Sequence, residues 1–94
     1  YDIAMRYHIR VNNAHRKTLA AVYARPPRAD VRWSDIESLV RAAGGEIHER
    51  AGSRVAMALN GVVAVFHRPH PKPVTNKGAV DAVRRFLDTA GVNP

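Results

Sequence analysis

The chain has 94 residues, no cysteine and a formal net charge of +7, from 15 Lys and Arg against eight Asp and Glu. This length predicts one small domain, and the lack of cysteine excludes disulfides and thiolate metal sites and fits a cytoplasmic protein. No apolar run is long enough to span a bilayer, so we expect a soluble protein that does not act in a membrane. The surplus of cations predicts a polyanionic partner, nucleic acid or an acidic protein, over the alternative that the charge only aids solubility.

The first eleven residues alternate between apolar and polar side chains, which is typical of a β-strand. Arg6, His8 and Arg10 interrupt this segment, so it does not read as a secretory signal. Because the sequence does not start with Met, residues 1–13 are interpreted as an extension: an added edge strand, a disordered tail or vector-derived sequence. Residues 14–94 are expected to form the domain.

Two helices are predicted next. The first runs from about His15 to Ala24, has a basic start and stops at Pro26-Pro27. The second begins at a capping box from Ser34 to Glu37 and leaves through Gly44-Gly45. We expect Trp33, just before this cap, to be a packing anchor rather than a base-stacking platform. The apolar stripes are Leu19, Val22 and Tyr23 on the first helix and Ile36, Leu39, Val40 and Ala43 on the second.

Three antiparallel strands follow. The segment from Arg54 to His67 predicts two strands joined by Asn60-Gly61, because a two-residue type I′ turn needs positive φ at both positions. A strand from Glu46 to Arg50 precedes them through the turn 51–53. A three-residue turn sets Arg50 opposite Arg54, while Arg54 faces His67. One face is then apolar and should be covered by the helices, whereas His48, Arg50, Arg54 and His67 gather at one end of the other face. A loop one residue longer or shorter would move His48 and Arg50 to the covered side.

The C-terminal part is basic as well. A proline-rich loop holds Arg68, His70 and Lys72, and a last helix runs from about Lys77 to Ala90. Thr75 or Asn76 is expected to cap this helix. Lys72, Lys77 and the free N–H groups of the helix start predict a phosphate site, although loops before helices are often basic without a ligand. We expect Val80, Val83, Leu87 and Ala90 to face inward, Phe86 to flank them, and Arg84 and Arg85 to face outward.

From Trp33 onward, the predicted order is helix, three strands, helix, an α+β fold with both helices on one face of the sheet. In this order and spacing the chain resembles the HicA family, the toxin half of HicBA toxin-antitoxin pairs. The matching pieces, over about Ser34 to Val92, are Gly44-Gly45 after a helix, Gly52-Ser53 before the hairpin, and then Pro69-His70-Pro71, Lys77-Gly78 and Ala90-Gly91-Val92. The helix at His15 to Ala24 is similar to an extension that some longer members carry.

The resemblance implies a dsRBD-like fold and an mRNA-cleaving toxin that needs no metal or other cofactor and is neutralised by a HicB-like antitoxin. It also implies a stress-response role. Family members usually carry a catalytic histidine directly after the Gly-Ser pair, and here that position is Arg54. No family histidine is therefore carried over to this chain.

Other residues could supply the chemistry. RNA cleavage without a metal needs a base for the 2′-OH, an acid for the leaving oxygen and cations for the developing negative charge. Histidine suits the first two roles because it titrates near physiological pH. We therefore interpret His67 and His48 as candidate catalytic residues, and the alternatives are a hydrogen-bonded strand-end residue and a solvated strand face. The candidate RNA-binding residues are Arg50, Arg54, Arg68, His70, Lys72 and Lys77.

Three classes of function remain open from the sequence. The first is an endoribonuclease toxin, which the resemblance and the His/Arg cluster favour. The second is an RNA-binding module without nuclease activity, which Arg54 at the usual histidine position favours. The third is a protein whose basic face binds an acidic protein such as an antitoxin. A DNA target is less expected, because no helix-turn-helix spacing is present.

Overall fold

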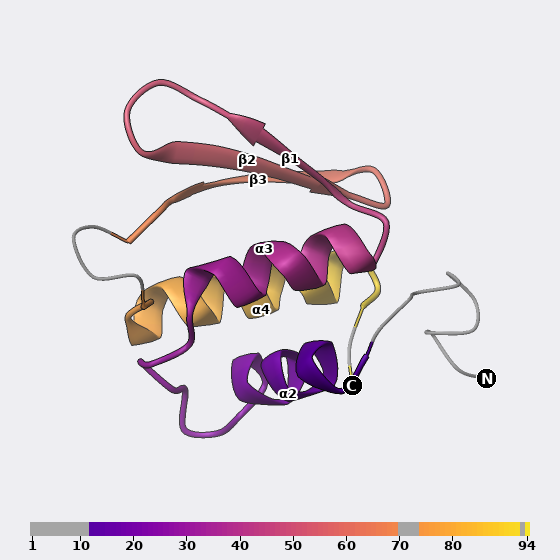
Figure 1. The fold of residues 1–94 in the computed structure, drawn as a ribbon, viewed down its shortest axis with the longest axis vertical. Helices are drawn as coiled ribbons and strands as arrows, with labels where there is room; N and C mark the ends of the chain where they lie inside the picture. Colours follow the sequence, from indigo (N-terminus) through magenta and orange to yellow (C-terminus); the bar gives the residue numbers. More distant parts are fainter. Residues whose placement is uncertain (1–11, 70–73, 93) are drawn as a thin grey trace.

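The computed structural model describes residues 12–69, 74–92 and 94 (Figure 1). The predicted N-terminal strand and most of the proline-rich loop, including His70 and Lys72, lie outside these residues. The helices are α2 (Asn13–Val22), α3 (Trp33–Ala42) and α4 (Lys77–Thr89), and the strands are β1 (Glu46–Glu49), β2 (Arg54–Leu59) and β3 (Val62–His67).

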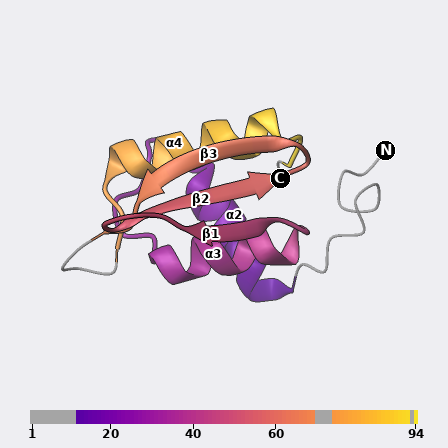
Figure 2. The same ribbon diagram turned by 90° about the horizontal axis from the view of Figure 1, so that it is seen from above.

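The described part of the chain forms three layers. The strands make one antiparallel sheet in the order β1-β2-β3. Helices α3 and α4 lie side by side under one face of this sheet, and α2 packs on the far side of these two helices (Figures 1 and 2). From α3 onward the order is α-β-β-β-α, as in dsRBD-like α+β folds, so the predicted fold is confirmed.

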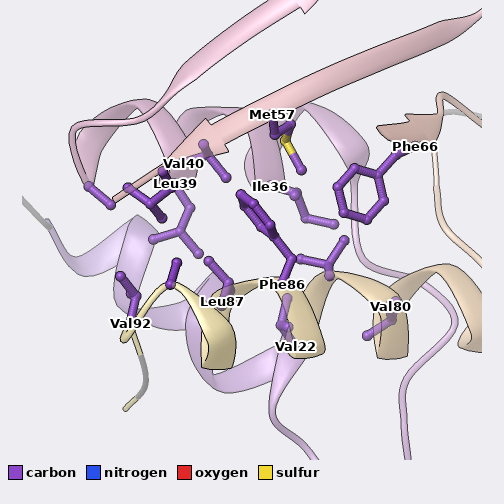
Figure 3. Close-up of a cluster of buried hydrophobic side chains, with 14 of the residues drawn as sticks. Val22, Ile36, Leu39, Val40, Met57, Phe66, Val80, Phe86, Leu87 and Val92 are labelled. Carbon is purple, nitrogen blue, oxygen red and sulfur yellow. The ribbon is translucent and has the colours of Figure 1, made fainter. Parts of the chain in front are cut away.

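The core lies between the sheet and α3 and α4 (Figure 3). Alternate residues of β2 and β3 point into it, because side chains along a strand alternate between its two faces. The Phe66 ring lies between those of Trp33 and Phe86, with centroids 5.8 Å away in each case. Trp33 is 5% exposed, so its expected packing role is confirmed. The fully buried side chains include Ile36, Leu39, Val40, Val55, Met57, Val80, Val83 and Leu87.

Both turns of the sheet have the predicted geometry. Asn60 and Gly61 take φ values of 52° and 81°, as a type I′ turn requires. The resulting register places Arg54 opposite His67. The turn 51–53 has three residues and places Glu49 opposite Val55, so the predicted register of β1 is confirmed too.

The predicted start of α3 was wrong. The helix begins at Trp33 with Arg32 as its N-cap, and no side chain caps it, so Ser34 and Glu37 form no capping box. Tertiary contacts explain the earlier start: Arg32 pairs with Val74 in an isolated β-bridge, and Trp33 is buried. Glu37 points inward and accepts hydrogen bonds from the side chains of Trp33 and Arg68 instead of from a backbone N–H at the helix start.

Smaller differences concern the other helices. Helix α2 begins and ends about two residues earlier than predicted, because Asn12 caps it by accepting from the His15 N–H at 2.9 Å. Asn76 caps α4, accepting from the Ala79 N–H at 2.8 Å. Arg84 was expected to face outward, yet it is half-buried between carboxylates.

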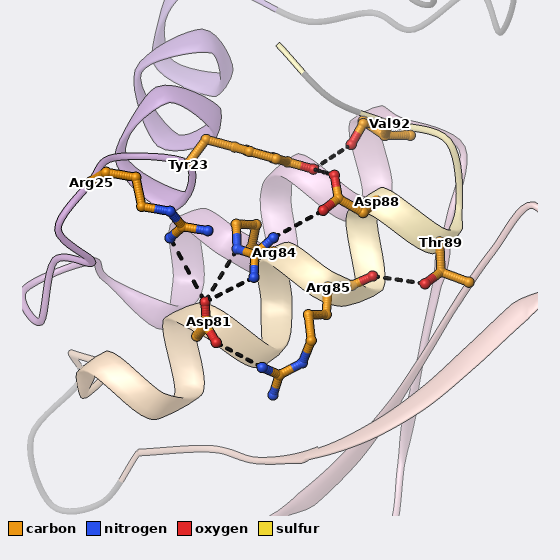
Figure 4. Close-up of polar contacts among 8 residues, drawn as sticks. All are labelled: Tyr23, Arg25, Asp81, Arg84, Arg85, Asp88, Thr89 and Val92. Atoms are coloured by element: carbon orange, nitrogen blue, oxygen red, sulfur yellow. Dashed lines mark hydrogen bonds and ion pairs between the residues drawn. The ribbon is translucent and has the colours of Figure 1, made fainter.

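Polar contacts tie α2 to α4 (Figure 4). The Tyr23 hydroxyl donates to Asp88 at 2.7 Å, and burial together with this contact raises the tyrosine pKa well above its usual value. Asp81 accepts hydrogen bonds from Arg84 and Arg85 and forms an ion pair with Arg25 at 3.7 Å. These contacts fix α2 and the following linker against the two-helix layer.

We expect Gly45→Ala to destabilise the protein. A Cβ at this position would lie 2.8 Å from the Ala58 carbonyl oxygen and 2.6 Å from Cγ1 of Val40, so backbone as well as side chain must move. Overpacking of this kind costs about 1–3 kcal/mol of unfolding free energy. The control is Gly52→Ala, where φ is +70° but no atom lies within 4 Å, and where the cost is about 1 kcal/mol. Urea denaturation of both variants checks the difference; equal midpoints would contradict it.

Candidate nucleic-acid interface

Three cationic or titratable side chains form a row across one end of the sheet, here called the basic row: Arg50, Arg54 and His67. The last two are direct cross-strand partners. The Arg50 N–H donates to the Arg54 carbonyl at 3.0 Å, which places Arg50 opposite Arg54 on the other side. All three residues are exposed on the face that α3 and α4 leave open. The sheet register therefore brings together three of the four residues that the sequence placed at this end of the open face.

The basic row has no internal counter-charge. Arg54 Nε donates to the Ala51 carbonyl at 3.2 Å and Arg50 Nη1 to the Glu49 carbonyl at 3.2 Å, which leaves their other N–H groups available. Among the described residues, no carboxylate forms an ion pair with either arginine, whereas Arg68, Arg84 and Arg85 are all paired. Like charges directly opposite in a sheet are destabilising. An external anion would relieve this repulsion.

His48 lies apart from the basic row. It pairs with Ala56 on β2, and its Nε2 is 2.9 Å from Glu46 Oε1. Its backbone is two strands and two residue positions away from His67, a separation of roughly 12 Å. The two predicted catalytic histidines therefore lie on the same face of the sheet, but they are too far apart to act on opposite sides of one phosphodiester bond.

Arg68 is engaged on the helix side of the sheet. Its Nε and Nη2 donate to the two carboxylate oxygens of Glu37 at 2.8 and 3.2 Å, and its Nη1 donates to Glu49 at 2.7 Å. The hydrogen bonds to Glu49 and Glu37 raise the pKa of Arg68. The hydrogen bond from Arg68 lowers the pKa of Glu49 below its usual value. The Trp33 Nε1–H also donates to Glu37. Two carboxylates therefore occupy the Arg68 guanidinium in this structure, and the predicted role of Arg68 toward RNA stays a prediction.

The third predicted cluster is described only in part. Lys77 is the exposed first residue of α4. Its expected companion Lys72 lies outside the described residues, as does His70, so the predicted phosphate site before α4 stays a prediction.

Sequence reasoning missed two features of this region. Glu49 could have been found, because the predicted register already placed it beside Val55 on the covered face. The pairing of Glu37 with Arg68 carries no local signal, since the two residues are 31 positions apart.

The basic row lies on an open sheet face. A surface hollow of about 300 Å³ beside α2 is lined by Lys17, Arg32 and Asp35 among others, and another of about 250 Å³ adjoins Arg68. Neither includes the basic row. Small molecules favour concave sites that enclose them, so an open face is better suited to an extended polyanion.

Two negative findings apply to the described residues alone. No three or more His, Asp or Glu side chains among residues 12–69 and 74–92 lie close enough together to hold a metal ion. No helix in the same part of the chain has the length and apolar character needed to cross a membrane.

Comparison with known proteins adds the family. Searches of curated proteins and of solved structures returned no match. The family model described as the HicA toxin of bacterial toxin-antitoxin systems matches residues 33–92, nearly the span over which the resemblance was noted. These residues include α3, the whole sheet with its basic row, and α4, while α2 lies outside them. The match covers well over half of the chain, which therefore belongs to the HicA toxin family and is a toxin of a toxin-antitoxin system.

Proposed function

We propose that this toxin binds single-stranded mRNA through the basic row and cleaves it without a metal ion. The observation that carries the proposal is the row itself: two arginines, which pair with no carboxylate in residues 12–69 and 74–92, stand beside a histidine on an open sheet face. Arginine N–H groups bind phosphate oxygens in pairs, and an open face admits an extended chain.

The row gives each residue a role. Arg50 and Arg54 hold the scissile phosphate and stabilise the negative charge that develops on it. His67 takes the proton from the 2′-OH, because an imidazole is an effective base near neutral pH. The 2′-oxygen then bonds to phosphorus and displaces the 5′-oxygen, which takes a proton from water and leaves a 2′,3′-cyclic phosphate on the other fragment. Arg54, which stands where relatives usually have their catalytic histidine, thus acts in binding and charge stabilisation, and the imidazole comes from the neighbouring strand.

The alternative function is RNA binding without cleavage. It is favoured by the distance between the histidines: with His48 roughly 12 Å away, the described part of the row holds one imidazole rather than an acid and a base. Recognition of RNA through its backbone needs cations but no catalytic group. Incubation of the protein with RNA in EDTA separates the two functions.

We expect Arg54→Ala to weaken RNA binding in a salt-dependent way. Each arginine that contacts a phosphate contributes about one unit to the slope of log affinity against log salt, so the variant should lose about one unit or slightly less. Fluorescence anisotropy with a labelled single-stranded RNA, at several salt concentrations, measures this slope.

The matched control for this measurement is Arg16→Ala. It removes the same charge from the exposed surface of α2, in the layer farthest from the sheet. Its slope should stay close to that of the wild type. If both variants lower the slope equally, binding depends on net charge alone and the basic row is not the site.

A further inference from the structure

Strand β3 forms an edge of the sheet and carries both large apolar side chains that are highly exposed in the described part of the chain. Val63 and Val65 are 64% and 56% exposed and lie on the open face. Figure 2 shows β3 at the outer edge of the sheet, with β2 on its other side. His67 is the next residue of β3 on the same face.

The backbone of the same three residues also points outward. The Arg68 N–H donates to the Ser53 carbonyl at 2.9 Å, so this pair is hydrogen-bonded across β2 and β3. Hydrogen-bonded and non-bonded pairs alternate along an antiparallel ladder. The pairs that contain Val63, Val65 and His67 are therefore non-bonded, and the N–H and C=O groups of these residues face away from β2. No other residue in the described ranges forms a hydrogen bond with these groups.

The other edge is different. On the open face of β1 the exposed side chains are Glu46 and His48, which bond to each other. Charged side chains on an edge strand discourage pairing with another chain, whereas an apolar edge with free backbone groups favours it. The two edges of this sheet are thus unequal, and β3 is the one suited to receive a strand.

We propose that β3 is the docking edge for an extended strand of an acidic partner protein, the antitoxin, and that a carboxylate on this strand reaches the His67 end of the basic row. The strand adds to the sheet beside β3, places apolar side chains against Val63 and Val65, and places a carboxylate opposite His67, within reach of Arg54. The net charge of +7 favours an acidic occupant over a second copy of this chain. The inference rests on the proposed function, because the carboxylate would take the place of the RNA phosphate.

Hydrogen exchange gives a direct test with the purified antitoxin partner of this toxin. The amides of Val63, Val65 and His67 should exchange fast in the free toxin and slowly in the complex. The amides of Val62, Ala64 and Phe66 should be protected in both states, because they already bond to β2. Antitoxin binding that leaves the first three amides fast, or no binding at all, would overturn the proposal. Protection of these amides in the free toxin, together with dimer formation, would assign the edge to a second copy.

A variant separates this inference from the proposed function. The double substitution Val63→Thr and Val65→Thr keeps β-branched side chains but removes apolar contacts. It should weaken antitoxin binding at least about tenfold and leave RNA binding unchanged. The control Glu46→Thr, on the opposite edge of the same face, should affect neither. If the wild type fails to bind RNA while the amide pattern is as expected, strand docking stands and the RNA proposal fails.

Discussion

His67→Ala should lower the rate of RNA cleavage by about 10²–10⁴-fold while RNA affinity changes little. The size of the loss is typical for removal of a group that transfers a proton in the transition state. Affinity should be retained because Arg50 and Arg54 still provide the phosphate contacts. Single-turnover cleavage of a labelled mRNA fragment in EDTA, with toxin in excess, measures the chemical step apart from binding.

The matched control for this loss is His15→Ala. His15 bonds to Ser38 from α2, on the other side of the helix layer, so its removal changes the composition equally without touching the basic row. Cleavage by this variant should equal that of the wild type. A wild type that binds RNA but does not cleave it would establish the alternative function, and full activity of His67→Ala would remove His67 from the mechanism.

Glu37→Ala should destabilise the fold by about 3 kcal/mol, through the loss of a buried carboxylate that accepts hydrogen bonds from two side chains. The Glu37 side chain is 9% exposed and accepts from both Trp33 and Arg68. Its removal leaves the indole N–H without an acceptor and the guanidinium with one carboxylate less. For a domain of this size the melting temperature should fall by about 15 °C, which thermal denaturation followed by circular dichroism would show.

Glu49→Ala tests whether burial causes that effect. Glu49 also bonds to Arg68, at 2.7 Å, but its side chain is 71% exposed. An exposed ion pair contributes little to stability, so this variant should lose much less than Glu37→Ala. Equal losses would show that the charge on Arg68, rather than the buried acceptor, controls stability.

The sheet could be predicted because its information is local. Asn60-Gly61 fixes both the turn type and the pairing of its flanking strands, and Gly52 in a three-residue turn does the same for β1. Once the register is known, the alternation of side chains places Arg54 and His67 on one face. The basic row therefore followed from turn chemistry alone.

The start of α3 and the state of Arg68 could not be predicted in this way. Ser34 and Glu37 have the spacing of a capping box, but Glu37 forms stronger contacts with Trp33 and Arg68 once Phe66 and α3 pack together. Those partners come from distant parts of the chain. The capping-box spacing fails here because the tertiary structure offers the buried Glu37 carboxylate better hydrogen-bond donors than the helix start does.

The strict alternation of β3 has a consequence for how this toxin can diversify. Val62, Ala64 and Phe66 pack toward the helices, so changes there compromise folding, whereas Val63, Val65 and His67 are free of that constraint. At Val63 and Val65 the sequence can thus change together with the strand that we propose docks there, whereas His67 is held by its proposed role in cleavage. In a saturation library of β3 that is selected only for solubility, positions that tolerate substitution should alternate with positions that do not.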